Sequence, residues 1–143
     1  QLDQLTSLLV TVLGVPRVYA ITGDLGAGKT TFAQSMARAF GVIEPVVSPT
    51  FTLINEYQSP SGGRMVHADL YRLTNKREIH ELGLDELLFG PTTLGIVEWA
   101  DRCPDIFDGR TISVELVATG DRRVAILQHI PHQDALALER ALR

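Results

Sequence analysis

The sequence Gly23-Asp24-Leu25-Gly26-Ala27-Gly28-Lys29-Thr30 has the G-x-x-x-x-G-K-[ST] pattern of a phosphate-binding loop. It follows an apolar run at residues 18–21 and precedes a stretch of helical character that ends at Phe40. In this strand–loop–helix order, the glycines let successive backbone N–H groups point at phosphate oxygens, and the start of the helix adds its positive dipole end. The stretch therefore predicts an α/β protein with the P-loop NTPase fold.

Two side chains of this loop predict specific contacts. Lys29 provides a positive charge for the β- and γ-phosphates of a nucleotide, and the Thr30 hydroxyl is placed to hold a Mg²⁺ ion that bridges them. A glycine-rich turn that only caps a helix is the alternative interpretation. The preceding strand and the following helix favour phosphate binding.

The length and cysteine content of the chain fit one domain in a reducing compartment. A chain of 143 residues can bury a core without disulfides or metals, so we expect residues 1–143 to form a single P-loop ATPase domain. The single Cys103 cannot form an internal disulfide, which fits the cytosol. No apolar run approaches the length of a transmembrane helix. We therefore expect a soluble cytoplasmic protein without a membrane partner.

The charge balance argues against a protein that binds nucleic acid by itself. The formal net charge is −4, and the only adjacent basic pairs are Lys76-Arg77 and Arg122-Arg123. Phosphate backbones require clustered Lys and Arg. Any role with RNA is therefore expected to be indirect.

Apolar spacing and turn residues predict helices that alternate with strands. Helices are expected over residues 2–13, 31–40, 78–89 and 134–143. Gly83 interrupts the third lightly, and Leu136 and Ala141 of the fourth should face inward. Strands are expected over residues 18–21, part of 48–57, 64–68, 94–97, 111–117 and 124–127. This order implies a mainly parallel central sheet flanked by helices, with an antiparallel hairpin around residues 59–63.

Two acidic residues stand at the ends of predicted strands. Glu98 follows residues 94–97, as the acid of a Walker-B strand normally does, although Asp is commoner there; Asp69 follows residues 64–68. Phosphoryl chemistry needs a carboxylate near Mg²⁺ and a group that orients the nucleophile. Both acids are candidates for these roles. The alternative for either is a helix cap or an ion pair with a nearby arginine.

Four further features have two interpretations each. Thr50, in Ser48-Pro49-Thr50, either senses a γ-phosphate or stands in a Pro-ordered turn. His67 either polarises a water or contacts a phosphate, or it is a structural histidine. Trp99 either stacks on a base or a partner, or it packs in the core. The stretch Asn75-Lys76-Arg77-Glu78 only partly matches the N-K-x-D signature that reads guanine. This incomplete match favours ATP over GTP as the nucleotide.

Five ordered blocks between residues 18 and 102 resemble one known family, the bacterial TsaE (YjeE) ATPases. The blocks are residues 23–32, 48–53, 67–73, 81–83 and 97–100. The resemblance implies a cytoplasmic, Mg²⁺-dependent ATPase required for the threonylcarbamoyladenosine modification of tRNA next to the anticodon. It also implies TsaD and TsaB as partners, with tRNA reached only through that complex. We expect slow ATP hydrolysis by the chain alone and faster hydrolysis with the partners.

The resemblance also implies roles for individual positions. The phosphates of ATP would be bound by Gly26, Ala27, Gly28, Lys29, Thr30 and Thr31. The metal ligands would be Thr30 and Glu98, and the catalytic residues Lys29, Asp69 and Glu98. Thr50 matches a switch-like loop of the family, and Trp99 follows the metal-site Glu.

The base of the nucleotide is the part of the site for which the match is weakest. Family members usually carry a Thr near the base, and Leu2 stands about where that Thr would fall. Arg123, after the Gly120-Asp121 turn, is a candidate for the adenine side, and a surface arginine is its alternative interpretation.

Two other functional classes are compatible with a P-loop. A small-molecule kinase would share the loop and would usually add an Arg-rich lid, and no such cluster is present, although Arg72, Arg77 and Arg102 are available. A nucleotide-dependent adaptor would use bound ATP to control assembly, with only incidental hydrolysis. Phosphoryl transfer to a metabolite would identify the kinase, and single-turnover assays with and without partners would separate enzyme from adaptor.

Overall fold

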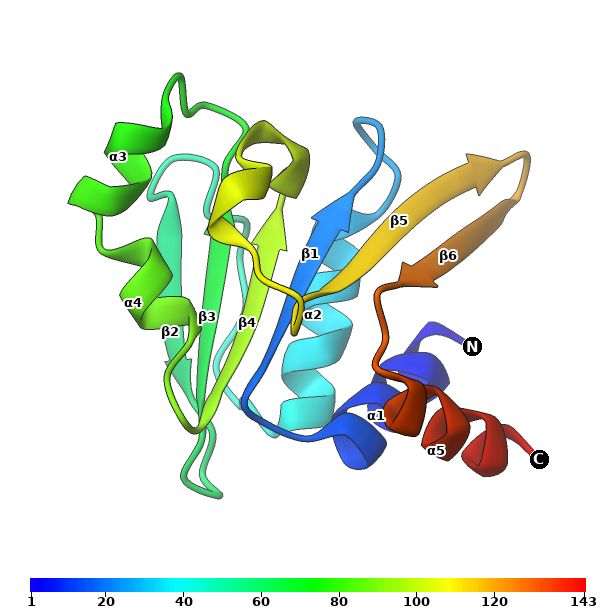
Figure 1. Cartoon of the computed structure of the whole chain (residues 1–143). Coiled ribbons are helices and arrows are strands. Elements are labelled where there is room, and N and C mark those ends of the chain that lie inside the picture. Colours follow the sequence, from blue (N-terminus) through cyan, green and yellow to red (C-terminus); the bar gives the residue numbers. More distant parts are fainter.

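A six-stranded sheet with the strand order β2-β3-β4-β1-β5-β6 runs through the computed structural model, which describes all residues from Gln1 to Arg143 (Figure 1). The strands are β1 (Arg17–Thr22), β2 (Ile54–Gln58), β3 (Arg64–Asp69), β4 (Thr93–Glu98), β5 (Ile112–Thr119) and β6 (Arg122–Gln128). The four inner strands β3, β4, β1 and β5 pair in parallel, while β2 and β6 add antiparallel pairing at the edges. The predicted α/β class with a mainly parallel sheet is confirmed.

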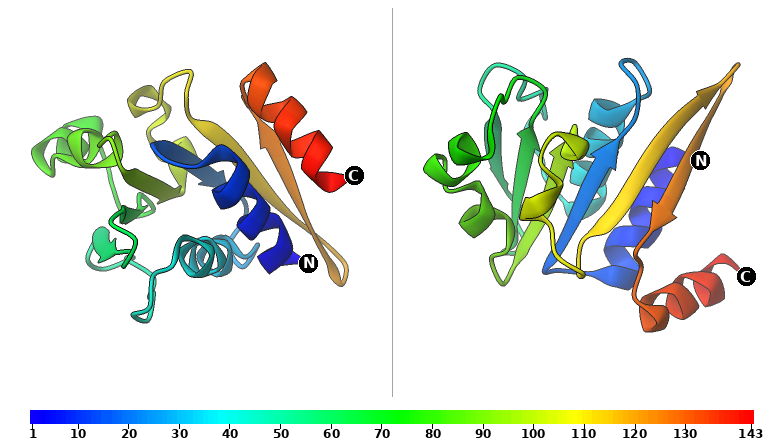
Figure 2. Two further views of the ribbon diagram at one scale, coloured as in Figure 1. Left: turned by 90° about the horizontal axis from the view of Figure 1, so that it is seen from below. Right: turned by 45° about the horizontal axis from the view of Figure 1, so that its top comes forward.

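Helices cover both faces of this sheet (Figure 2). They are α1 (Leu2–Leu13), α2 (Lys29–Phe40), α3 (Lys76–Glu81), α4 (Leu84–Leu88) and α5 (His132–Leu142), with short 3-10 turns at Ala100–Arg102 and Pro104–Ile106. One core cluster joins α1 and α2 to the sheet, and α5 reaches it through Leu138. A second cluster joins α3, α4 and the 3-10 turns to the opposite face. None of the helices combines the length and apolar character that crossing a bilayer requires.

Strand alternation decides which residues of β3 and β4 face α2. Met65 and Ile96 pack in the core cluster that contains α2, whereas Val66 and Val97 pack in the cluster on the other face. Because side chains two residues apart lie on the same face of a strand, the side chains of His67, Asp69 and Glu98 face α2. Asp69 and Glu98 are register partners at the ends of their strands.

Two predictions about helices need correction: the interruption expected at Gly83 is a complete break, and the residues expected to face inward on the last helix are wrong. The helix expected over residues 78–89 is two short helices, because Gly83 between them has a φ of +69°, a left-handed conformation that an α-helix cannot contain. In α5, Leu136 is 38% exposed and Ala141 is also exposed, while Leu138 is buried. Because α5 lies at the margin of the core, only a narrow stripe of this helix contacts the rest of the molecule.

Candidate functional site

The loop between β1 and α2 presents unpaired backbone groups at the end of the sheet. Gly28, with a φ of +105°, is the N-cap of α2, and no side chain caps this helix end. Left-handed backbone of this kind favours glycine, and the first N–H groups of an uncapped helix are free to bind an anion. At the other end of the loop, a Cβ on Gly23 would lie 2.6 Å from the carbonyl oxygen of Leu116. Both positions therefore need glycine for the loop to keep its shape.

Lys29 is held inside this loop. Its Nζ donates hydrogen bonds to the carbonyl oxygens of Gly23 and Asp24 at 2.7 and 2.8 Å, and it lies 4.0 Å from the ring centroid of Trp99. Burial lowers the pKa of Lys29 below its ordinary value, and the negative charges of Glu98 and Asp69 oppose this shift. The ammonium group thus lies beside the loop backbone, next to two carboxylates.

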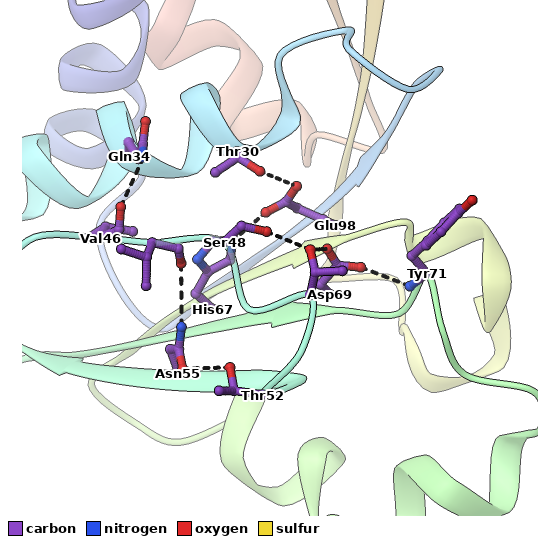
Figure 3. Close-up of polar contacts among 12 residues, drawn as sticks. Thr30, Gln34, Val46, Ser48, Thr52, Asn55, His67, Asp69, Tyr71 and Glu98 are labelled. Carbon is purple, nitrogen blue, oxygen red and sulfur yellow. Dashed lines mark hydrogen bonds and ion pairs between the residues drawn. The ribbon is translucent and has the colours of Figure 1, made fainter.

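Glu98 links the phosphate loop to the sheet. The Thr30 hydroxyl donates to its Oε1 at 2.9 Å, and Nε2 of His67 lies 2.6 Å from its Oε2 (Figure 3). Glu98 and His67 are both buried, with 2% and 0% of their surface exposed. The structure therefore brings the predicted metal ligands, Thr30 and Glu98, into direct contact.

Asp69 lies beside this pair and is held by the loop that contains Thr50. The Thr50 hydroxyl donates to Asp69 Oδ2 at 3.1 Å, and the backbone N–H of Tyr71 donates to Oδ1 at 2.8 Å (Figure 3). Oγ of Ser48 and Oγ1 of Thr50 are 2.7 Å apart. The Ser48-Pro49-Thr50 loop is thus connected to an acidic residue of the site.

These groups line one cavity of about 360 Å³. Its lining residues are Leu25, Gly26, Gly28, Lys29, Thr30, Thr31, Ser48, Thr50, Asp69, Glu98 and Trp99. Every residue predicted to bind phosphate, to hold the metal or to act in catalysis is among them, except Ala27. Lys29 is the only cationic side chain in this lining.

A second, larger cavity of about 990 Å³ adjoins the first, since Gly26, Gly28 and Thr31 line both. It lies between the start of α1 and the β5–β6 hairpin, and Ala27, Leu2 and Arg123 are in its lining. The structure therefore places both positions considered for the base next to the phosphate loop, although they are far apart in the sequence.

The donor atoms around Thr30 suit Mg²⁺. A hydroxyl and a carboxylate are oxygen ligands of the kind that Mg²⁺ prefers, and this ion is usually held by one or two carboxylates together with substrate phosphates. No cluster of three or more His, Cys, Asp or Glu side chains in the chain could hold a metal by itself. The residues present fit an ion that takes some of its ligands from the protein and the rest from the phosphates of a nucleotide.

Two features of the site region, the backbone of Trp99 and the contact of His67, were not predictable from residue types alone, whereas the position of Asn75 before a helix was. Trp99 has a φ of +56°, and its ring lies over Nζ of Lys29 and is tilted by 46° against the ring of Tyr71, with 4.7 Å between the two ring centroids. His67 contacts Glu98 rather than lining either cavity. Asn75 is the N-cap of α3, and its Oδ1 accepts a hydrogen bond from the Glu78 N–H at 3.1 Å. The partial N-K-x-D match is therefore a helix start.

Comparison with known proteins relates this geometry to one family. The family model "Threonylcarbamoyl adenosine biosynthesis protein TsaE" matches residues 1–125. The tRNA threonylcarbamoyladenosine biosynthesis protein TsaE of a Nostoc species is 45% identical over 102 residues, which cover 68% of this chain and 60% of that protein. The protein of the same name from Rickettsia bellii is 38% identical over 105 residues, which cover 73% of this chain and 71% of that protein.

A solved structure agrees with these matches. The crystal structure of YdiB from Bacillus subtilis has a TM-score of 0.73 and 27% sequence identity, and the match covers 99% of this chain and 89% of that one. The family model spans most of the chain, and relatives above 30% identity match more than two thirds of it. The chain therefore belongs to the TsaE family of tRNA threonylcarbamoyladenosine biosynthesis proteins.

Proposed function

We propose that this chain binds and hydrolyses ATP with Mg²⁺, as a component of the machinery for the threonylcarbamoyladenosine modification of tRNA. The observation that carries the proposal is the 2.9 Å hydrogen bond between Thr30 and Glu98, which joins the phosphate loop to a strand-end carboxylate. A P-loop by itself only binds phosphates, whereas a hydroxyl and a carboxylate in contact beside it supply metal ligands for phosphoryl chemistry.

The phosphates of ATP bind in the cavity of about 360 Å³. Backbone N–H groups at the uncapped start of α2 donate to their oxygens, and the buried ammonium of Lys29 faces the same space. Lys29 exchanges its contacts with the carbonyl groups of Gly23 and Asp24 for phosphate oxygens when the nucleotide enters. An anion also offsets the cost of burying the ammonium group.

Thr30 and Glu98 would hold Mg²⁺, which would offset the negative charge of the phosphates. Asp69 has a different role, because its Oδ2 accepts a hydrogen bond from Thr50, in the loop before β2, and not from Thr30 of the phosphate loop. We assign Asp69 and the Ser48-Pro49-Thr50 loop to the orientation of the attacking water. The carboxylate accepts a hydrogen bond from that water, and the loop responds to the γ-phosphate.

The nucleoside occupies the larger cavity beside the phosphate loop. Its lining offers the apolar side chain of Leu2 and the guanidinium of Arg123, which can stack on a base. Asn75 is engaged as a helix cap, which leaves no guanine-reading signature at that position. ATP is therefore the nucleotide that we assign to the site.

Partners complete the site in this proposal. Phosphoryl transfer builds up charge that P-loop enzymes offset with an arginine, and no arginine lines the phosphate cavity. The missing lid arginines also favour hydrolysis over transfer to a small molecule. We assign the partners as TsaD- and TsaB-like proteins, through which the chain acts on tRNA in the cytoplasm.

Competition binding tests the nucleotide assignment. A fluorescent ATP analogue is bound at equilibrium and displaced with ATP or GTP, in Mg²⁺ and in excess EDTA, and phosphate release is followed in parallel. We expect ATP to displace the analogue better than GTP, with tighter binding in Mg²⁺. Equal displacement by both nucleotides would refute the choice of ATP, and transfer of the γ-phosphoryl to an added metabolite would identify a kinase.

A further inference from the structure

His67 is a buried polar residue whose function the nucleotide contacts do not explain. It lies in the middle of β3 on the face toward α2, none of its surface is exposed, and it is not in the lining of either cavity. A direct contact with a phosphate or with the attacking water, which was one interpretation of the sequence, has no support in this geometry. Its contact is instead with Glu98.

The geometry decides which atom donates in this contact. Nε2 of His67 is 2.6 Å from Oε2 of Glu98, and the Thr30 hydroxyl donates to Oε1 of the same carboxylate. A carboxylate that holds a metal ion is ionised and only accepts hydrogen bonds, so in the proposed site Nε2 carries the hydrogen. Nδ1 of His67 is buried without a partner, which makes Glu98 the only polar partner of the ring. Both oxygens of Glu98 thus receive a donor, one from β3 and one from α2.

We propose that His67 is a positioning residue for the metal site: it fixes the rotation of the Glu98 carboxylate so that Oε1 stays directed at Thr30 and the ion. This role rests on the proposed function, because it gives Glu98 its orientation as a Mg²⁺ ligand. A carboxylate with one donor can rotate about its last bond, whereas donors on both oxygens hold it in one orientation. Loss of a partner that orients a metal ligand in this way typically lowers metal affinity or activity by about 10- to 100-fold.

Three substitutions at this position separate positioning from space filling. The amide nitrogen of His67→Gln can stand where Nε2 stands and can still donate to Glu98. In His67→Asn the amide is shorter and stands near the position of Nδ1, so this donor is lost while a polar side chain remains. His67→Leu removes the polar group and keeps much of the volume. The matched control is Met65→Ala, two residues earlier on the same face of β3 and equally buried.

The readout is the ratio of ADP affinities in Mg²⁺ and in excess EDTA, measured by titration calorimetry alongside thermal unfolding midpoints. This ratio is the gain in ADP affinity that Mg²⁺ provides. For His67→Leu and His67→Asn we expect the gain to fall by roughly 10-fold or more, while the affinity for ADP in EDTA stays unchanged. His67→Gln should keep most of the gain. Met65→Ala should lower the unfolding midpoint without changing the gain. If His67→Leu does not fold, the Asn and Gln variants decide the question.

Three results would overturn the proposed role of His67, and only the second of them also refutes the Mg²⁺ site. A wild-type gain that persists unchanged in the Asn and Leu variants refutes positioning and leaves the proposed Mg²⁺ site intact. A wild-type protein that binds ADP equally well in Mg²⁺ and in EDTA refutes the Mg²⁺ site itself, and the role of His67 with it. Loss of the gain in His67→Gln as well would show that the donated hydrogen bond is not what matters.

Discussion

At the scale of single residues, Glu98 is expected to serve ATP hydrolysis and to contribute little to nucleotide affinity. Its carboxylate contacts Thr30 and His67, while the groups that would hold the phosphates are backbone N–H groups and Lys29. Glu98→Ala should therefore lower ATP turnover by roughly 10²- to 10³-fold, the usual cost of losing a well-placed electrostatic group. Affinity for ADP in EDTA should change little. Steady-state phosphate release and equilibrium binding test this, and wild-type turnover in a folded Glu98→Ala protein would contradict it.

Substitution of Lys29 should instead weaken nucleotide binding itself. The chain has two lysines, Lys29 in the loop and Lys76, whose Nζ lies 3.4 Å from Asp105 on the surface. Lys29→Ala should abolish measurable binding of a labelled ATP analogue while the protein stays folded, because its polar partners are two carbonyl groups of the loop. Lys76→Ala, which removes an equal charge, should bind the analogue normally. Tight binding by a folded Lys29→Ala protein would remove the basis for the phosphate site.

At the scale of secondary-structure elements, the start of α3 tests whether Asn75 reads a base or caps a helix. The Asn75 side chain accepts a hydrogen bond from the Glu78 N–H. Asn75→Ala should therefore destabilise the protein by about 1 kcal/mol, the typical cost of a lost N-cap, and leave the preference for ATP over GTP unchanged. Chemical denaturation and nucleotide competition measure the two effects. A change in nucleotide preference with unchanged stability would instead mean that Asn75 contacts the base.

The elements also show what a sequence can and cannot predict. The loop at residues 23–30, its strand and its helix are predictable because glycine spacing and apolar runs are local properties. The division of residues 78–89 depends on the left-handed backbone at Gly83, which a glycine permits but does not require. The burial of Leu138 in place of Leu136 depends on how α5 docks at the margin of the core.

The same distinction holds for the candidate site. Asp69 and Glu98 could be singled out because an acid directly after an apolar strand is visible in the sequence. The contact of His67 with Glu98 depends on the parallel register of β3 and β4, in which Asp69 pairs with Glu98. The ring of Trp99 reaches Lys29 from a residue with positive φ. Neither packing nor strand register has a local sequence signal.

At the scale of the whole molecule, the two adjoining cavities form the nucleotide site that we propose. The phosphate cavity contains one cationic side chain, Lys29, beside the carboxylates of Asp69 and Glu98. Two exposed apolar side chains belong to the segments around this cavity: Leu25, which lines it, is 83% exposed, and Phe51, which follows the lining residue Thr50 in the sequence, is 81% exposed. A partner protein that covers this cavity could supply the missing positive charge and order the loop around Thr50. ATP binding and partner binding should then be thermodynamically linked.

The most direct test is the steady-state rate of phosphate release from ATP and Mg²⁺, titrated with purified TsaD- and TsaB-like partners. We predict slow release by the chain alone, a saturable increase as the partners are added, and no increase for Glu98→Ala at the same partner concentrations. Fast release by the chain alone that does not respond to the partners would contradict a site completed by partners. Release that is equally fast for wild type and Glu98→Ala would contradict the assignment of the catalytic site itself.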